Sequence, residues 1–124
     1  MSMRKKLLIV DDDDAVIEFL RAKLSSRYDI VSTNAPENVL RLARKEHPDL
    51  ILCDLDMPEM DGGDVSKELF DDANLRAIPV LFLSALVTAE DMKNLGHQIG
   101  GRSAISKQAP PEELAQRIDS LILV

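Results

Sequence analysis

Short apolar runs alternate with longer segments in which apolar residues recur at helical spacing. The runs are rich in Leu, Ile and Val, which is typical of strands buried on both faces of a parallel sheet. They span residues 6–10, 28–32, 49–54, 79–83 and 104–106. This alternation predicts an α/β fold: a three-layer sandwich with a mostly parallel five-stranded sheet, five helices and right-handed crossovers.

The segments between these runs carry helix signals. Asp13 and Asp14 can cap a first helix, and residues 35–46 and 64–72 predict the second and third. Thr88 and Asp91 match a capping box for a short fourth helix that Gly96 would end, and a last helix begins after residue 110. The apolar stripe of the first helix is predicted to consist of Val16, Phe19, Leu20 and Leu24.

Polar side chains follow the predicted strands, where parallel strands bring their carboxyl ends to one edge of the sheet. These residues are Asp11, Asp12, Asp54, Asp56, Ser84 and Lys107. Two carboxylates about 4 Å apart repel by about 4 kcal/mol at an effective dielectric constant near 20, so such a cluster needs a cation. Two or three carboxylates, a backbone carbonyl and water suit octahedral Mg²⁺.

Other metal sites fit the sequence poorly. An EF-hand loop that began at Asp54 would place Glu59 where a glycine is required. The candidate zinc ligands, Cys53, His47 and His97, lie in separate segments without ligand spacing, and Cys53 is interpreted as a small core residue. Mg²⁺ beside an aspartate, a lysine and a serine instead suits phosphoryl transfer to an aspartate oxygen.

Four segments carry a family resemblance. They are residues 7–13 (LLIVDDD), 52–62 (LCDLDMPEMDG), 79–85 (PVLFLSA) and 105–107 (ISK). Together they resemble the receiver domain of two-component response regulators, and the resemblance covers essentially the whole chain. It implies the flavodoxin-like strand order 2-1-3-4-5, with residues 1–124 forming a single receiver domain and no output domain in this chain.

The resemblance also implies the chemistry. Asp54 would accept a phosphoryl group from the phosphohistidine of a sensor histidine kinase or a histidine phosphotransfer protein. The phosphorylated domain would then act on an unidentified downstream effector protein or domain. Asp12 would be the principal Mg²⁺ ligand, with Asp11 acting through water and with Asp54 and the Asp56 backbone carbonyl completing the protein ligands. Ser84 and Lys107 would contact phosphoryl oxygens. Catalysis would be limited to the domain's own phosphorylation and dephosphorylation, so no enzyme in the ordinary sense is expected.

Two positions depart from the family pattern. Gln108 stands where receivers carry a proline in a cis peptide, so we expect either a trans bond with a rearranged loop or a strained cis bond. Ala104 replaces the aromatic switch residue, and the read-out is expected to pass instead through residues 84–87 and the helix that follows. Leu86, Val87 and Met92 form a candidate partner patch, with packing against the sheet as the alternative.

Composition narrows the function classes. Acidic residues outnumber basic ones by 22 to 15, which gives a net charge of −7 and disfavours direct binding to nucleic acid. No membrane-spanning or signal segment is visible, and one cysteine rules out internal disulfides. These features predict a cytoplasmic protein without a membrane partner.

Four other functions share single features with this sequence. Ala104 and Gln108 leave open a receiver-like interaction module that works without phosphorylation, but the presence of Asp12, Asp54 and Lys107 argues against it. An aspartate-nucleophile phosphatase shares the pattern Asp-x-Asp, but Pro58 stands where that class has Thr or Val. A flavodoxin would need a Ser/Thr-rich loop where this chain has four acidic residues. A histidine phosphotransfer protein needs an exposed histidine in mid-helix, and neither His47 nor His97 is placed so.

Overall fold

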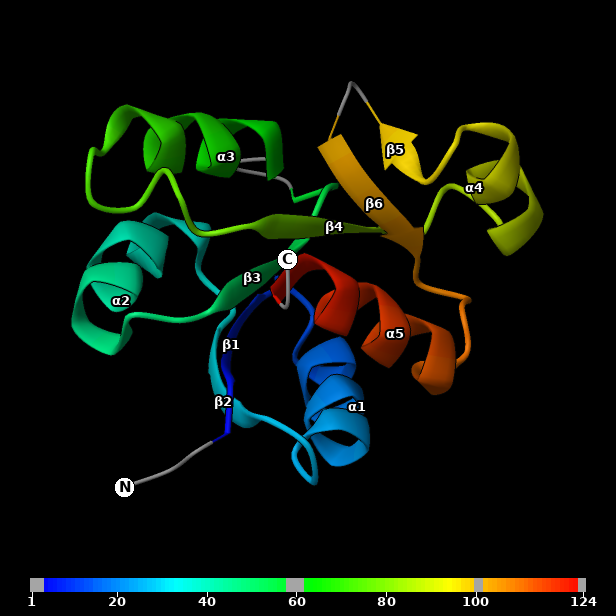
Figure 1. The fold of residues 1–124 in the computed structure, drawn as a ribbon, viewed down its shortest axis with the longest axis horizontal. Helices are drawn as coiled ribbons and strands as arrows, with labels where there is room; N and C mark the ends of the chain where they lie inside the picture. The colour runs from blue at the N-terminus through cyan, green and yellow to red at the C-terminus, as the bar shows by residue number, and fades with distance from the viewer. Residues whose placement is uncertain (1–3, 58–61, 100–101, 123–124) are drawn as a thin grey trace.

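A mostly parallel β-sheet lies between two layers of helices (Figure 1). The computed structural model describes residues 4–57, 62–99 and 102–122. Within them the elements are β1 (Lys6–Val10), α1 (Asp14–Leu24), β2 (Asp29–Thr33), the 3-10 turn η1 (Pro36–Asn38), α2 (Val39–Glu46), β3 (Leu50–Asp54), α3 (Gly62–Asp71), β4 (Val80–Ser84), α4 (Ala89–Asn94), β5 (Gln98–Ile99), β6 (Arg102–Ser106) and α5 (Pro111–Ile122).

The strand order is β2-β1-β3-β4-β6-β5. The five longer strands are parallel and follow the predicted order 2-1-3-4-5, with β6 in the place of the predicted fifth strand. The prediction of only five strands was wrong, because the two-residue strand β5 pairs antiparallel with β6 at the edge of the sheet. Gly96 and His97, with φ angles of 69° and 58°, turn the chain into this strand, which is too short to give a period-two signal.

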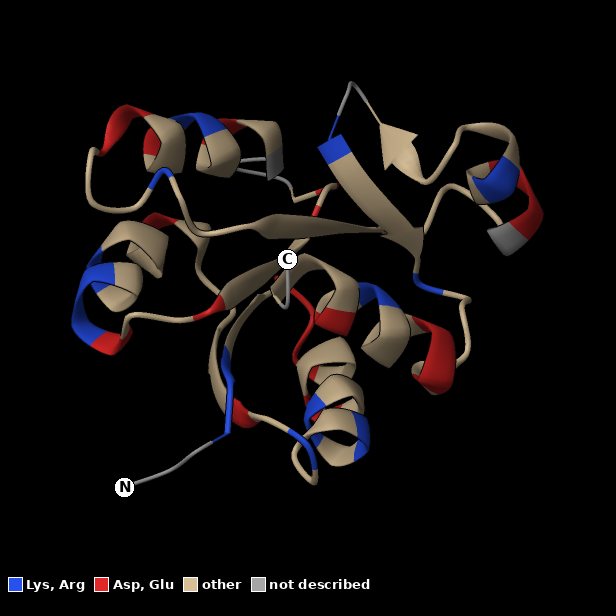
Figure 2. Cartoon of the chain, in the orientation of Figure 1, with Lys and Arg blue, Asp and Glu red and all other residues tan. Residues whose placement is uncertain are grey.

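Alternate residues of each central strand enter two separate cores. In β1, Leu7 and Ile9 pack in a cluster with residues of α1 and α5, whereas Leu8 and Val10 pack in a cluster with residues of α2, α3 and α4. Both clusters are closed to solvent, which explains why the strands are continuously apolar. Charged residues lie mainly on the helices and connecting loops, and the strands are mostly uncharged (Figure 2).

Helix ends follow the predicted capping. The Asp13 side chain accepts a hydrogen bond from the Ala15 amide at the start of α1, and Thr88 and Asp91 form the capping box of α4. The predicted second helix instead begins as the 3-10 turn η1 and continues as α2. Among the described residues no helix is long and apolar enough to cross a membrane.

Two predictions about apolar side chains need correction. Phe19, predicted to lie in the core, is 53% exposed. Ile17, which was not predicted there, is buried together with Leu20 and Leu24. The Lys23 ammonium lies 5.6 Å from the centroid of the exposed Phe19 ring. In the predicted partner patch, Met92 is buried against the sheet while Leu86 remains 80% exposed. Cys53 is buried in β3, as predicted for a core residue.

The orientation of α1 can be tested with two substitutions on the same helix. Ile17→Ala removes a buried side chain and is expected to lower the free energy of unfolding by about 2–4 kcal/mol. Phe19→Ala removes an exposed ring and should cost less than about 1 kcal/mol. Urea unfolding of the two variants measures both values, and a larger loss for Phe19→Ala would contradict the orientation.

Candidate functional site

The sheet brings the predicted polar residues to one edge. Asp11 directly follows β1, Asp54 and Ser84 end β3 and β4, and Lys107 directly follows β6. These strands are parallel neighbours, so their carboxyl ends lie on the same side of the sheet. One carboxylate oxygen from each of Asp11, Asp12 and Asp54 lies within 4.8 Å of the other two. The three acidic residues expected to converge therefore do so.

Lys107 neutralises part of this cluster. Its Nζ lies 2.9 Å from Oδ2 of Asp11 and 3.3 Å from Oδ1 of Asp54. The Lys107 amide also donates to the Ser84 carbonyl at 2.8 Å, which extends the β4–β6 pairing to the lysine itself. Burial disfavours the ammonium charge, but the ion pairs with Asp11 and Asp54 outweigh it and raise the pKa of Lys107. The lysine is thus held charged between the two carboxylates.

Asp11 and Asp12 have different surroundings although they are adjacent. Asp11 is fully buried, and its Oδ1 accepts a hydrogen bond from the Asp13 amide at 2.9 Å. Asp12 is exposed at the rim of the cluster. A ligand that entered from solvent would therefore meet the Asp12 carboxylate before that of Asp11.

Asp54 is the most perturbed carboxyl group of the cluster. Its side chain is buried, with 3% of the residue exposed, and Oδ1 accepts from the Asp56 amide at 3.1 Å. Burial, with a further contribution from the charge of Asp11, raises the pKa of Asp54 to about 6, although the Asp56 amide and Lys107 both act to lower it. Without a further cation, the charged form of Asp54 is therefore less stable, relative to the protonated form, than that of a solvent-exposed aspartate.

The three carboxylates provide the donor set that a hard divalent cation prefers. They offer oxygen ligands from two buried residues and one exposed residue, and the single charge of Lys107 leaves the set net negative. The residues present therefore fit Mg²⁺. Asp56 follows β3 with an exposed side chain, and its amide, which bonds to Asp54, fixes the backbone at this point. Residues 58–61 of the predicted active-site loop lie outside the described residues.

Ser84 is buried at the end of β4. Its Oγ accepts a hydrogen bond from the Leu86 amide at 3.2 Å, so the hydroxyl is tied to the first residues after the strand. The structure thus places Ser84 at the same edge as the acidic cluster and connects it to the segment that leads to α4.

Ser106 supports the site, a role that was not predicted from the sequence. Its Oγ accepts from the Gln108 amide at 3.1 Å, and its carbonyl accepts from the Ala109 amide at 3.0 Å. Within the described residues all peptide bonds are trans, including the one between Lys107 and Gln108. Glutamine supplies an N–H that proline lacks, and this N–H closes the turn after Lys107. A serine hydroxyl commonly accepts a hydrogen bond from the amide two residues later, so Ser106 followed by the non-proline residue Gln108 is the sequence signal for this turn.

Comparisons with known proteins agree with this geometry. The family model of the response regulator receiver domain matches residues 7–119. The polar-differentiation response regulator DivK of Brucella ovis is 35% identical over 121 residues, which cover 97% of this chain and 98% of DivK. The transcriptional regulatory protein PhoP of Bacillus subtilis is 33% identical over 124 residues, which cover 97% of this chain and 49% of PhoP. The chain thus spans about half the length of some curated relatives and nearly all of others.

Solved structures show the same fold. A response regulator from Desulfuromonas acetoxidans superposes with a TM-score of 0.79 at 26% identity, and the match covers 96% of this chain and 97% of that one. The receiver domain of a sensor histidine kinase from Pseudomonas aeruginosa PAO1, solved with a magnesium ion coordinated in its active-site cleft, superposes with a TM-score of 0.81 at 23% identity and covers 98% of this chain and 99% of that one. On the family match and these relatives, the chain belongs to the receiver domains of two-component response regulators.

Proposed function

We propose that this receiver domain takes up a phosphoryl group on Asp54 from the phosphohistidine of a sensor histidine kinase or a histidine phosphotransfer protein. The observation that carries the proposal is the buried Asp54 carboxylate, which lies 3.3 Å from Lys107 and shares a cluster with two further carboxylates. An Asp54 oxygen forms the new bond to phosphorus while the bond from phosphorus to the histidine nitrogen breaks, and the imidazole leaves.

The residues around Asp54 would hold Mg²⁺ through Asp11, Asp12, Asp54 and the backbone carbonyl of Asp56. Bound there, Mg²⁺ supplies charge neutralisation for the phosphoryl oxygens. The related receiver domain from Pseudomonas aeruginosa, which carries magnesium in its cleft, supports this assignment. Asp12, the exposed member of the cluster, is the side chain best placed to meet an incoming ion.

Lys107 and Ser84 would contact the transferred group. The Lys107 ammonium already bridges Asp11 and Asp54, so it is positioned to offset the charge of about −1.5 to −2 that a phosphoryl group adds. The Ser84 hydroxyl would donate to a phosphoryl oxygen. The catalysis of this chain is then limited to its own phosphorylation and the later loss of the phosphoryl group.

The read-out would differ from that of receivers with an aromatic switch. Ala104 is fully buried in the core cluster that contains Phe82 and Met92. Because its side chain is a methyl group, this position has no aromatic ring that could change orientation. The Ser84 hydroxyl, in contrast, is bonded to the Leu86 amide. A phosphoryl oxygen that recruits Ser84 would disturb this bond and shift residues 84–87, where Leu86 offers an exposed apolar side chain to an effector.

The acceptor chemistry predicts a single phosphoryl addition that requires Mg²⁺. Intact-protein mass spectrometry after incubation with acetyl phosphate should show it in the native chain, and EDTA or Asp54→Asn should abolish it. Asp56→Asn is the matched control, because the proposal assigns only the backbone of Asp56 and this variant should remain phosphorylated. If the native chain binds Mg²⁺ without phosphoryl addition, the result would favour an interaction module that works without phosphorylation.

The raised pKa of Asp54 predicts a pH-dependent stability difference in metal-free protein. As the pH rises from 3.8 to about 6, the unfolded chain loses this proton before the folded chain does, so the native protein loses stability through that window. Asp54→Asn lacks this loss. The variant should match the native protein near pH 4 and exceed it by about 1–3 kcal/mol at pH 7.

Urea unfolding in EDTA at several pH values measures this difference. Added Mg²⁺ should stabilise the native protein more than Asp54→Asn at pH 7, because the ion binds the charged carboxylate. A difference between the two proteins that is the same at pH 4 and pH 7 would contradict the assignment of the raised pKa to Asp54.

The proposed read-out predicts a local change on phosphorylation. Amide NMR signals of residues 84–87 should move when the native chain is phosphorylated, whereas Ser84→Ala should show much smaller shifts in this segment at equal phosphorylation. Signals of α2 serve as the internal reference, because this helix lies on the opposite side of the molecule from α4 (Figure 1). Unchanged signals for residues 84–87 in fully phosphorylated protein would refute this read-out.

A further inference from the structure

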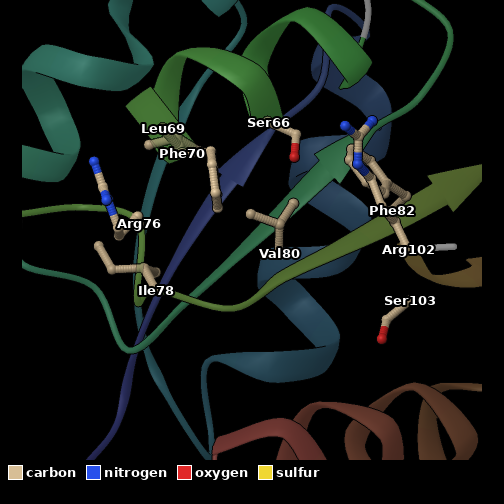
Figure 3. A pocket seen from close by; sticks show the side chains of 9 residues that line it. All are labelled: Ser66, Leu69, Phe70, Arg76, Ile78, Val80, Phe82, Arg102 and Ser103. Carbon is tan, nitrogen blue, oxygen red and sulfur yellow. The ribbon is translucent and has the colours of Figure 1, made fainter. Parts of the chain in front are cut away.

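A groove lies between α3 and strands β4 and β6, away from the acidic cluster. Its volume is about 200 Å³. It includes Val80 and Arg102, the first residues of β4 and β6, whereas the acidic cluster lies at the carboxyl ends of the strands. The groove residues used below are Ser66, Phe70, Arg76, Val80, Arg102 and Ser103 (Figure 3). The site is therefore distinct from the proposed phosphorylation site.

The middle of the groove is apolar. Phe70 projects from α3 with 66% of the residue exposed, and Val80 lies beside it on β4 (Figure 3). The side chain of Phe82 continues the apolar lining and is almost fully buried. An aromatic ring exposed beside an apolar floor gains stability when another apolar side chain covers it.

Two arginines flank this apolar middle. Figure 3 shows Arg76 on one side of Phe70 and Val80, and Arg102 on the other. The Arg76 guanidinium lies 5.5 Å from the centroid of the Phe70 ring, which holds the charge at the groove. Both arginines are exposed, and neither forms an ion pair with a carboxylate in the part of the chain that the structure describes. The groove thus carries positive charge on a chain whose net charge is −7.

The neighbouring strand pairing limits how a partner can bind. The outer edge of β6 at Arg102 and Ser103 is already paired with β5, so an additional strand cannot hydrogen-bond to the sheet there. Side-chain contacts remain, as when an amphipathic helix lies in a groove. Ser66 on α3 and Ser103 on β6 provide hydroxyl groups on the two walls of the groove.

We infer that this groove binds an acidic amphipathic helix of a partner protein. Apolar residues of the helix would cover Phe70 and Val80, while carboxylates at its two ends would pair with Arg76 and Arg102. Binding here does not depend on phosphorylation of Asp54.

A synthetic helical peptide tests the inference, with leucines along one face and glutamates near both ends. Titrated into the labelled full chain, it should cause saturable NMR shifts at Ser66, Phe70, Val80 and Ser103. Arg76→Glu and Arg102→Glu should each weaken its affinity about tenfold or more, because each puts a like charge against a glutamate. Arg41→Glu, which changes an exposed arginine on α2 by the same charge, is the matched control and should change the affinity less than about twofold.

Specific outcomes would overturn the inference. These are equal binding of a peptide with lysines in place of the glutamates, an equal loss of affinity in Arg41→Glu, or the absence of saturable shifts at the groove. Concentration-dependent shifts at the same residues without peptide would instead assign the groove to a second copy of the chain. Urea unfolding of each variant shows whether it keeps the native fold, and the Asp54→Asn protein should bind the peptide as the native chain does.

Discussion

The site depends on one electrostatic constraint: two buried carboxylates share one ammonium group. Asp11 and Asp54 lie 2.9 and 3.3 Å from Lys107, and Asp12 adds a third negative charge at the rim. Like charges at about 4 Å repel by about 4 kcal/mol in a protein environment, so a single lysine leaves the cluster short of positive charge. Uptake of a proton by Asp54, with its pKa near 6, or binding of a divalent cation relieves the same imbalance. In the proposed site, a proton and Mg²⁺ would therefore compete for this carboxylate.

The parallel sheet makes this arrangement possible at low conformational cost. Strands β1, β3 and β4 are buried on both faces along almost their whole length, which fixes their register and hence the positions of the residues at their carboxyl ends. Local hydrogen bonds from backbone amides then orient the side chains. The Asp13 amide orients Asp11, and the Asp56 amide orients Asp54. Rigid strands with tightly turned ends hold the charged groups more firmly than long loops would.

The sequence allows the fold and the membership of the cluster to be predicted, because both follow from where apolar runs stop. It does not give the features that depend on three-dimensional burial. The two-residue strand β5 is too short for a periodic pattern. Ile17, in contrast, lies three and seven residues before Leu20 and Leu24, so helical spacing could have placed it in the core instead of Phe19. The raised pKa of Asp54 arises mainly from burial, which neighbouring residues in the chain do not reveal. The turn closed by Ser106 and Gln108 could have been found from local hydrogen-bonding rules.

The two departures from the family pattern affect different parts of the molecule. Gln108 leaves the lysine in place, because its amide closes the turn and Lys107 remains bonded to the Ser84 carbonyl. Ala104 lies on the opposite face of β6 from Ile105, in the core cluster under α3 and α4, where it removes a movable ring without touching the acidic groups. Ser84 connects the two regions, since its carbonyl holds the lysine and its hydroxyl holds Leu86. In the proposed read-out, a signal from the acidic cluster would therefore pass through Ser84, which is hydrogen-bonded both to Lys107 and to Leu86.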